Sequence, residues 1–183
     1  MKNRMIPAGY MAKRILNRPE GFENTDIVDI YSVSSCMSKD FADYTEFWKH
    51  NGYWFFDSPH IIQQIAQEHS IELTGTKLFY YEVYNLEFHE DNEWTSFEPE
   101  ASFTTDIEKS NLKNLEGYDI VTFSCGNSPE CSPLSCNLLA NVVPVNKHCL
   151  LSSFDNAYQL LENGKFQNSE PGPYRILAVY SVS

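Results

Sequence analysis

The segment Leu78–Phe88 constrains the fold of this chain more than any other stretch of the sequence. Its residues are aromatic or aliphatic on both alternating faces at its start, and polar residues enter toward its end. A β-strand sends successive side chains to opposite faces of a sheet, so the pattern predicts a strand that is central at one end and exposed at the other. The polar stretch His89–Glu93 predicts a turn, and Trp94–Phe97 predicts a returning strand. We expect a β-hairpin with an acidic tip.

Shorter signals predict the remaining elements. Runs rich in β-branched and aromatic residues predict strands or buried extended chain at 26–33, 53–56, 118–124 and 174–182. Apolar residues at helical spacing, with capping residues beside them, predict helices at 38–50, 59–69 and 154–163, and weaker ones at 106–115 and 134–140. Strands that are partly sequential and partly separated by helices favour an α+β fold. We expect a mostly antiparallel, possibly mixed, sheet of about five or six strands with three or four helices packed on it.

Length and composition fit one folded domain. A chain of 183 residues is of ordinary domain size, and its 12 Phe, 11 Tyr and 3 Trp supply more ring surface than a disordered chain carries. No apolar run approaches the roughly 20 residues of a membrane-spanning helix. Residues 1–18 carry five Lys and Arg residues and no acid. We therefore expect a basic N-terminal arm at 1–20, with a helical turn at 10–16, docked on a single α+β domain at 21–183.

Acidic residues outnumber basic ones and are concentrated in one stretch. The chain has 13 Lys and Arg against 25 Asp and Glu, a formal net charge of −12, and no Lys or Arg lies between Lys77 and Lys109. Such a surface repels phosphates, so direct contact with nucleic acid is not expected. It favours a basic protein partner, although acidity alone also promotes solubility. The predicted contact residues are the hairpin acids, two exposed aromatic residues beside them and two residues of a later loop: Glu87, Glu90, Asp91, Glu93, Trp94, Phe97, Asn127 and Glu130.

The chain has five cysteines, four of them at positions 125 to 149, and they allow three interpretations. The odd number, with no apolar stretch of a secretory signal, predicts a reducing compartment and a cytoplasmic location. A catalytic thiol would use Cys131 or Cys136, activated by His148. A metal site is disfavoured because the cysteines lack the closely spaced pairs of zinc sites, and no cofactor is expected. The third interpretation is a proline-pinned loop whose cysteines are small buried side chains.

In bulk character the chain is similar to small acidic bacterial inhibitor and immunity proteins. The likeness depends on size, charge and free cysteines, and no motif accompanies it. It implies a protein that acts by binding. The sequence thus predicts a soluble acidic binding or inhibitor-type protein that engages a basic partner surface and does not associate with membranes. The alternative is a cysteine-dependent enzyme that uses the Cys131/Cys136 loop with His148.

Overall fold

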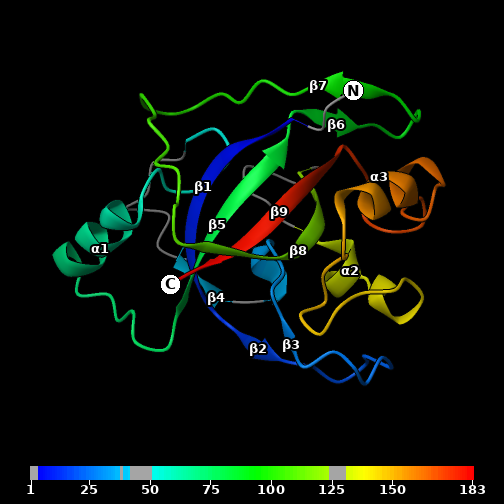
Figure 1. Cartoon of the computed structure of the whole chain (residues 1–183), viewed down its shortest axis with the longest axis horizontal. Helices are drawn as coiled ribbons and strands as arrows, with labels where there is room; N and C mark the ends of the chain where they lie inside the picture. The colour runs from blue at the N-terminus through cyan, green and yellow to red at the C-terminus, as the bar shows by residue number, and fades with distance from the viewer. Residues whose placement is uncertain (1–3, 38, 42–50, 124–130) are drawn as a thin grey trace.

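The computed structural model describes residues 4–37, 39–41, 51–123 and 131–183, and among them lies a seven-stranded sheet at the centre of the molecule (Figure 1). All of its strand pairs are antiparallel. Four long strands form its body, in the spatial order β1 (Met5–Arg14), β5 (Lys77–Tyr84), β9 (Tyr174–Val182) and β8 (Lys113–Thr122). The short strand β4 (Lys39–Asp40) pairs with β1, and the hairpin of β6 (Leu86–Phe88) and β7 (Trp94–Ser96) joins the sheet at β9.

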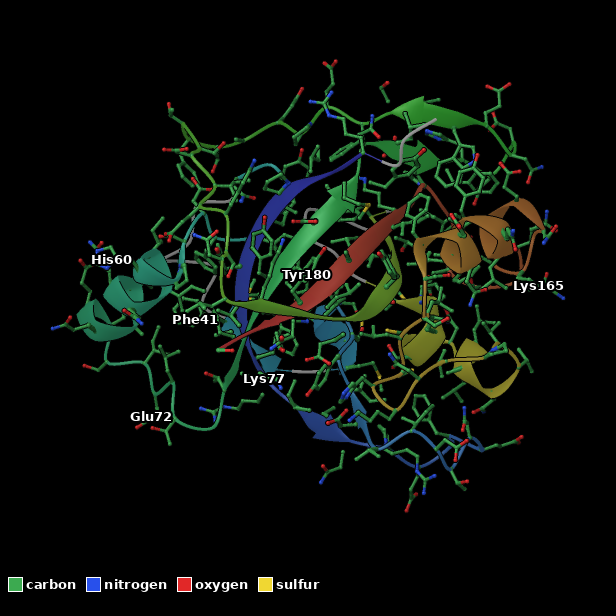
Figure 2. The ribbon with its side chains drawn as sticks, in the orientation of Figure 1. Phe41, His60, Glu72, Lys77, Lys165 and Tyr180 are labelled. Carbon is green, nitrogen blue, oxygen red and sulfur yellow. The ribbon has the colours of Figure 1, made fainter. Side chains whose placement is uncertain are left out.

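Tyrosines of three neighbouring strands lie across from one another in the sheet. Tyr10 is the register partner of Tyr80, and Tyr80 is the partner of Tyr180, which Figure 2 labels on β9. The ring centroid of Tyr80 lies 5.0 Å from that of Tyr10 and 5.8 Å from that of Tyr180. Directly opposite side chains of antiparallel strands are close enough to pack, so these rings help to set the register of the three strands.

Three α-helices cover the sheet within the described part of the chain. Figure 1 shows α1 (Pro59–Glu68) on one side, and α2 (Pro133–Cys136) and α3 (Phe154–Glu162) on the other. The hydroxyls of Ser58 and Ser153 cap α1 and α3 by accepting a backbone N–H of the first turn. Two 3-10 helices, η1 (Ser35–Met37) and η3 (Leu139–Asn141), and a small sheet of β2 (Leu16–Asn17) and β3 (Asp29–Ile30) complete the fold. None of the helices in these ranges is long and apolar enough to cross a membrane.

Buried side chains form two clusters. One includes Ile62 of α1, and the other includes Leu161 of α3. Successive residues of β8 fall in different clusters, with Ile120 beside α3 and Val121 in the cluster of α1. Because successive side chains of a strand point to opposite faces, the two clusters occupy the two faces of this part of the sheet.

The structure confirms the α+β class and the mostly antiparallel sheet. It also confirms the acidic hairpin and the helices predicted near 59–69 and 154–163. Asn85 interrupts the strand predicted at 78–88 and divides it into β5 and β6. Most of the helix predicted at 38–50 lies outside the described residues.

Two of the predicted helices are wrong. Residues 10–16 were expected to form a helical turn, but most of them belong to β1, which pairs with β5 from Met5 to Lys13. The side chains of β1 from position 8 to position 13 are buried, so residues of the expected basic arm are part of the sheet. No helix forms at 106–115, where the backbone N–H groups of Asp106 and Glu108 are bonded to Asp57 and strand β8 begins at Lys113. In both segments, long-range pairing of the backbone overrides local helical preference.

Candidate functional site

The turn between β6 and β7 projects the predicted acidic residues into solvent. The N–H of His89 donates to the carbonyl of Glu93 at 2.9 Å, and the N–H of Asn92 donates to the carbonyl of His89 at 3.0 Å. Asn92 adopts a φ of +66°, a left-handed conformation that asparagine tolerates well. The side chains of Glu90, Asp91 and Glu93 are exposed. The acidic side chains therefore extend from a turn that is closed by its own backbone hydrogen bonds.

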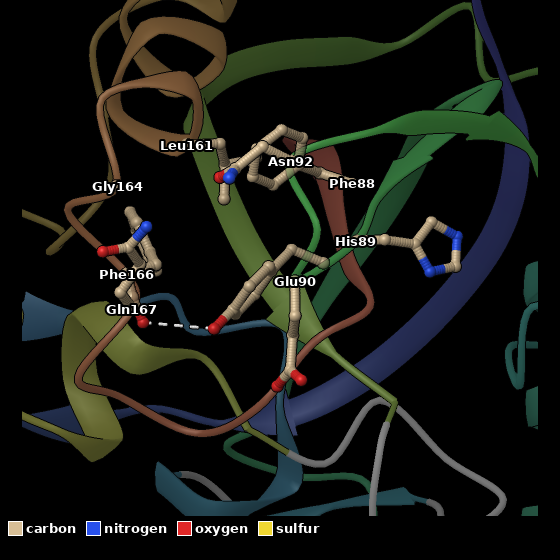
Figure 3. A pocket seen from close by; sticks show the side chains of 9 residues that line it. Phe88, His89, Glu90, Asn92, Leu161, Gly164, Phe166 and Gln167 are labelled. Atoms are coloured by element: carbon tan, nitrogen blue, oxygen red, sulfur yellow. Dashed lines mark hydrogen bonds between the residues drawn. The ribbon is translucent and has the colours of Figure 1, made fainter.

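A pocket of about 280 Å³ lies beside this turn (Figure 3). The residues that line it come from the hairpin, from β9 and from the segment around the end of α3, and include Phe88, Glu90, Asn92, Phe166, Gln167 and Tyr174. The ring of His89 points away from the other labelled side chains in Figure 3. The pocket thus combines aromatic walls with one exposed carboxylate at its edge.

Tyr174 connects the walls of the pocket. Its hydroxyl donates to the carbonyls of Phe166 at 3.1 Å and Glu170 at 2.8 Å, and its ring meets that of Phe166 edge to face at 5.8 Å. Burial raises the pKa of Tyr174, and the negative charge of Glu90 raises it further. Aromatic ring faces attract cations, and a carboxylate supplies the counter-charge. This arrangement favours a positively charged guest.

Glu87 lies on β6 but is not part of the exposed acidic group. Its Oε2 accepts hydrogen bonds from Nε and Nη2 of Arg175 at 3.0 and 2.9 Å, and its Oε1 lies 3.2 Å from Nε2 of His89. The Arg175 guanidinium lies over the rings of Phe97 and Phe123, at 3.4 and 3.9 Å from their centroids. Burial lowers the pKa of Arg175, and the hydrogen bonds and charge of Glu87 oppose that shift. Glu87 therefore holds β6 to β9.

Trp94 and Phe97 were expected to be exposed, but both are half-buried. The ring of Trp94 stacks on Tyr158 with centroids 4.6 Å apart and planes 2° apart, and its Nε1 donates to Glu162 at 2.8 Å. Phe97 covers the guanidinium of Arg175. Both aromatic residues therefore fasten the hairpin and the chain after it to α3 and the sheet, and the exposed acids at the tip are Glu90, Asp91 and Glu93.

The imidazole of His148 contacts two carboxylates and a tyrosine ring. Its Nδ1 lies 2.5 Å from Oδ1 of Asp29, and its Nε2 lies 3.6 Å from Oε2 of Glu116. Its ring stacks on Tyr31 with centroids 3.9 Å apart. The described residues that contact the His148 ring do so through carboxylate oxygens and a tyrosine ring, and not through a sulfur atom. The geometry therefore lends no support to activation of a thiol by His148.

Cys131 and Cys136 lie together, and Cys36 of η1 reaches the same place. The Cys131 thiol donates to Oδ1 of Asn137 at 3.8 Å. The sulfur of Cys136 lies 3.5 Å from the hydroxyl oxygen of Ser34, and the thiols of Cys131 and Cys36 are close enough to stabilise its ionised form. These contacts, that of Cys131 above all, lower the pKa of Cys136 to about 5 although burial opposes the shift. Burial raises the pKa of Cys149, which makes this thiol unreactive by comparison.

Comparison of the chain with models of protein families, with curated proteins and with solved structures found no match. In the described ranges, no group of three or more His, Cys, Asp or Glu side chains is placed to hold a metal ion. The predicted contact residues Asn127 and Glu130 lie outside those ranges. The acidic tip, the pocket and the group of thiols are thus the features from which function can be argued.

Sequence reasoning missed the pocket walls and one of the thiols. Phe166 and Tyr174 are far from the hairpin in the sequence, and the strand predicted at 174–182 and the helix predicted at 154–163 did not show that they meet it. Spacing along the sequence grouped only the four cysteines at positions 125 to 149, and no role was assigned to Cys36. Both groupings arise from contacts between distant segments, which no spacing rule within one segment can show.

Proposed function

We propose that the protein binds a basic partner protein through the tip of the β6–β7 hairpin, and that a Lys or Arg side chain of the partner enters the adjacent pocket. The observation that supports this best is the position of Glu90, an exposed acid that lines an aromatic-walled pocket. A pocket of about 280 Å³ has room for one long side chain.

The charge of the chain supports the same partner chemistry. The formal net charge is −12, and Asp91 and Glu93 add exposed carboxylates next to the pocket. Opposite charges speed the encounter of two proteins and exclude partners of like charge. A cation over an aromatic ring adds about 0.5–2 kcal/mol of attraction. We therefore propose electrostatic steering followed by insertion of a single cationic side chain, as an inhibitor-type protein would use.

The same acidity disfavours direct contact with nucleic-acid phosphates. A reducing, cytoplasmic location is part of the proposal, and it is supported by the odd number of cysteines and by the thiol state of Cys131, Cys136 and Cys149. The alternative function, a cysteine-dependent enzyme in which His148 activates Cys131 or Cys136, has less support because the ring nitrogens of His148 face carboxylates.

Binding of a fluorescein-labelled oligolysine peptide, followed by fluorescence polarisation, tests the proposal. We expect Glu90→Gln to weaken binding by about three- to tenfold, because the pocket loses its counter-charge. Glu20→Gln is the matched control: it removes the same charge from an exposed position that does not line the pocket, and we expect less than about a twofold loss.

Salt dependence gives a second criterion. Affinity should fall as the salt concentration rises from about 0.01 to 0.1 M, where the Debye length shortens from about 30 to 10 Å. Equal losses in the Glu90→Gln and Glu20→Gln variants would show that binding depends on overall charge and not on this pocket. An affinity that does not change with salt would contradict the electrostatic steering.

A further inference from the structure

Three cysteines form a cluster that extends from the surface into the protein. We call Cys36, Cys131 and Cys136 the thiol cluster. Cys36 is exposed, Cys136 is half-buried and Cys131 is buried. Both Cys131 and Cys36 lie close enough to the Cys136 sulfur to stabilise its ionised form. Small molecules can therefore approach the Cys136 sulfur, while one of its neighbours is shielded from solvent.

A buried carboxylate holds the backbone around the thiol cluster. Oδ2 of Asp119 accepts hydrogen bonds from the N–H of Val33 at 2.8 Å and from the hydroxyl of Ser132 at 2.7 Å, and Oδ1 accepts from the N–H of Ile120 at 2.9 Å. The Ser132 hydroxyl in turn accepts the N–H of Ser34 at 3.2 Å. The loop that leads to Cys36 is thus fastened to the residue that begins α2.

Lys13 fastens the same loop from the other side. Its side chain is 1% exposed, and its ammonium donates to the carbonyls of Ser32, Val33 and Ser34 at 2.7, 2.7 and 3.0 Å. Hydrogen bonds from a charged donor are stronger than those between neutral groups. The positions of the three sulfurs are therefore set by a buried polar framework, which keeps Cys131 and Cys136 in contact.

The surroundings of Cys136 favour its ionised form. The thiol of Cys131, the hydroxyl of Ser34 and the thiol of Cys36 lower the pKa of Cys136, in that order of effect. Asp119 and Cys149 are the other titratable groups that interact with Cys136, and the thiolate charge acts to raise the pKa of each. The thiolate is the nucleophilic form of cysteine, so Cys136 is ready to react near neutral pH.

We propose that Cys136 is a redox-reactive thiolate, which a hydroperoxide oxidises and which Cys131 then captures in a disulfide. In the first step the Cys136 sulfur attacks one peroxide oxygen: an S–O bond forms, the O–O bond breaks, and the leaving oxygen takes a proton to become an alcohol or water. The product is a sulfenic acid at Cys136. This inference does not depend on the hairpin site.

In the second step the Cys131 sulfur attacks the sulfur of Cys136. The S–S bond forms, the S–O bond breaks, and the hydroxyl leaves as water with the proton of the Cys131 thiol. Counted from the two thiols, the pair loses two electrons and two protons, one of the protons on ionisation of Cys136, and the peroxide is reduced. Cys131 rather than Cys36 is the partner because its thiol affects the ionisation of Cys136 most and because its side chain is buried away from competing solvent nucleophiles.

The first test is the rate of alkylation of the wild-type protein by iodoacetamide as a function of pH, measured for each cysteine by peptide mass spectrometry. An ordinary thiol with a pKa of about 8.5 should react roughly 80-fold faster at about pH 8 than at about pH 6. For Cys136 we expect less than about a twofold change over this range, and we expect Cys149 to stay unlabelled. A steep pH dependence at Cys136 would overturn the proposal.

The second test is treatment of the Cys125→Ser variant with hydrogen peroxide followed by chymotrypsin, because Cys125 and Cys131 otherwise lie on the same chymotryptic peptide. Cleavage after Leu134 places Cys131 and Cys136 on separate peptides, so a disulfide between them would link two peptides that are otherwise released separately. We expect this linked pair, and its loss on reduction. A disulfide of Cys136 with Cys36, or no disulfide at Cys136, would overturn the assignment.

Variants separate the two steps. In Cys131→Ser the sulfenic acid at Cys136 should persist and be trapped by dimedone, whereas Cys136→Ser should give neither dimedone adduct nor disulfide. Cys36→Ser is the matched control and should still form the disulfide. Far-UV circular dichroism checks that each variant folds. If a variant does not fold, the alkylation profile of the wild-type protein still tests the proposal. A dimedone adduct that forms equally in Cys136→Ser would overturn the proposal.

Discussion

Replacing Asp119 by asparagine should change how the stability of the protein depends on pH. The Asp119 side chain is 1% exposed, and burial raises the pKa of Asp119 from its ordinary 3.8 to about 6, although its hydrogen bonds with Ser132, Val33 and Ile120 act in the opposite direction. Because the folded pKa lies above the unfolded one, the unfolded chain ionises more readily. The neutral Asp119 side chain therefore stabilises the folded state fully below the unfolded pKa, and this contribution is lost as the pH rises through about 6.

The size of this effect follows from the two pKa values. Between pH 5 and 7.5, a group with a pKa of about 6 when folded and 3.8 when unfolded lowers the free energy of unfolding by roughly 1 to 1.5 kcal/mol. An asparagine amide does not ionise, so Asp119→Asn removes this pH dependence. Its single oxygen also leaves a buried donor unpaired, which costs about 1–3 kcal/mol at every pH. The stability advantage of the wild-type side chain should shrink as the pH rises.

Urea unfolding followed by far-UV circular dichroism at several values of pH measures this advantage. Both proteins should carry Cys136→Ser, because the thiol of Cys136, whose pKa is lowered to about 5, would also titrate in this range. Asp26→Asn replaces an exposed carboxylate and serves as control, with an expected change within about 0.5 kcal/mol at each pH. An advantage of Asp119 over asparagine that stays constant, or grows, between pH 5 and 7.5 would refute the reasoning.

Two further substitutions test the packing of the sheet. Arg175→Gln should lower the free energy of unfolding by up to about 3–5 kcal/mol in urea, because Glu87 would lose its main partner while its charge stays largely removed from solvent, and a loss below about 1 kcal/mol would contradict the role assigned to this pair. Gly9→Ala should lower the melting temperature more than Gly75→Ala does, although both glycines have positive φ. A Cβ at Gly9 would lie 2.6 Å from the carbonyl oxygen of Phe56, whereas a Cβ at Gly75 would approach only the flexible end of a side chain, at 3.4 Å. Equal melting temperatures would argue against the close approach at Gly9.

Local patterns predicted much of the fold. The alternation in Leu78–Phe88 identified β5 and β6, and the capping residues Ser58 and Ser153 located the starts of α1 and α3. These signals succeed because a turn of helix or a strand pleat depends on residues within a few positions of each other. They failed for β1, whose hydrogen bonds are made with residues about seventy positions away.

The candidate site was predictable in part. The sequence placed Glu90, Asp91 and Glu93 at a hairpin tip, and the structure has them there, exposed. It could not tell them from Glu87, because only the approach of Arg175 from β9 shows that this acid is paired. Charge can be counted along a chain, but pairing depends on which distant side chain lies within hydrogen-bond distance.

The amino-acid sequence by itself determined the class of fold, the acidic hairpin and the excess of negative charge, since each follows from residue type and short-range spacing. Only the tertiary structure decided that β1 lies inside the sheet, that aromatic residues of β6 and β9 enclose a pocket beside Glu90, and that Cys36 joins Cys131 and Cys136. Each of these depends on contacts between segments far apart in the chain. Such contacts are selected by the burial of apolar surface and the satisfaction of buried polar groups across the whole molecule.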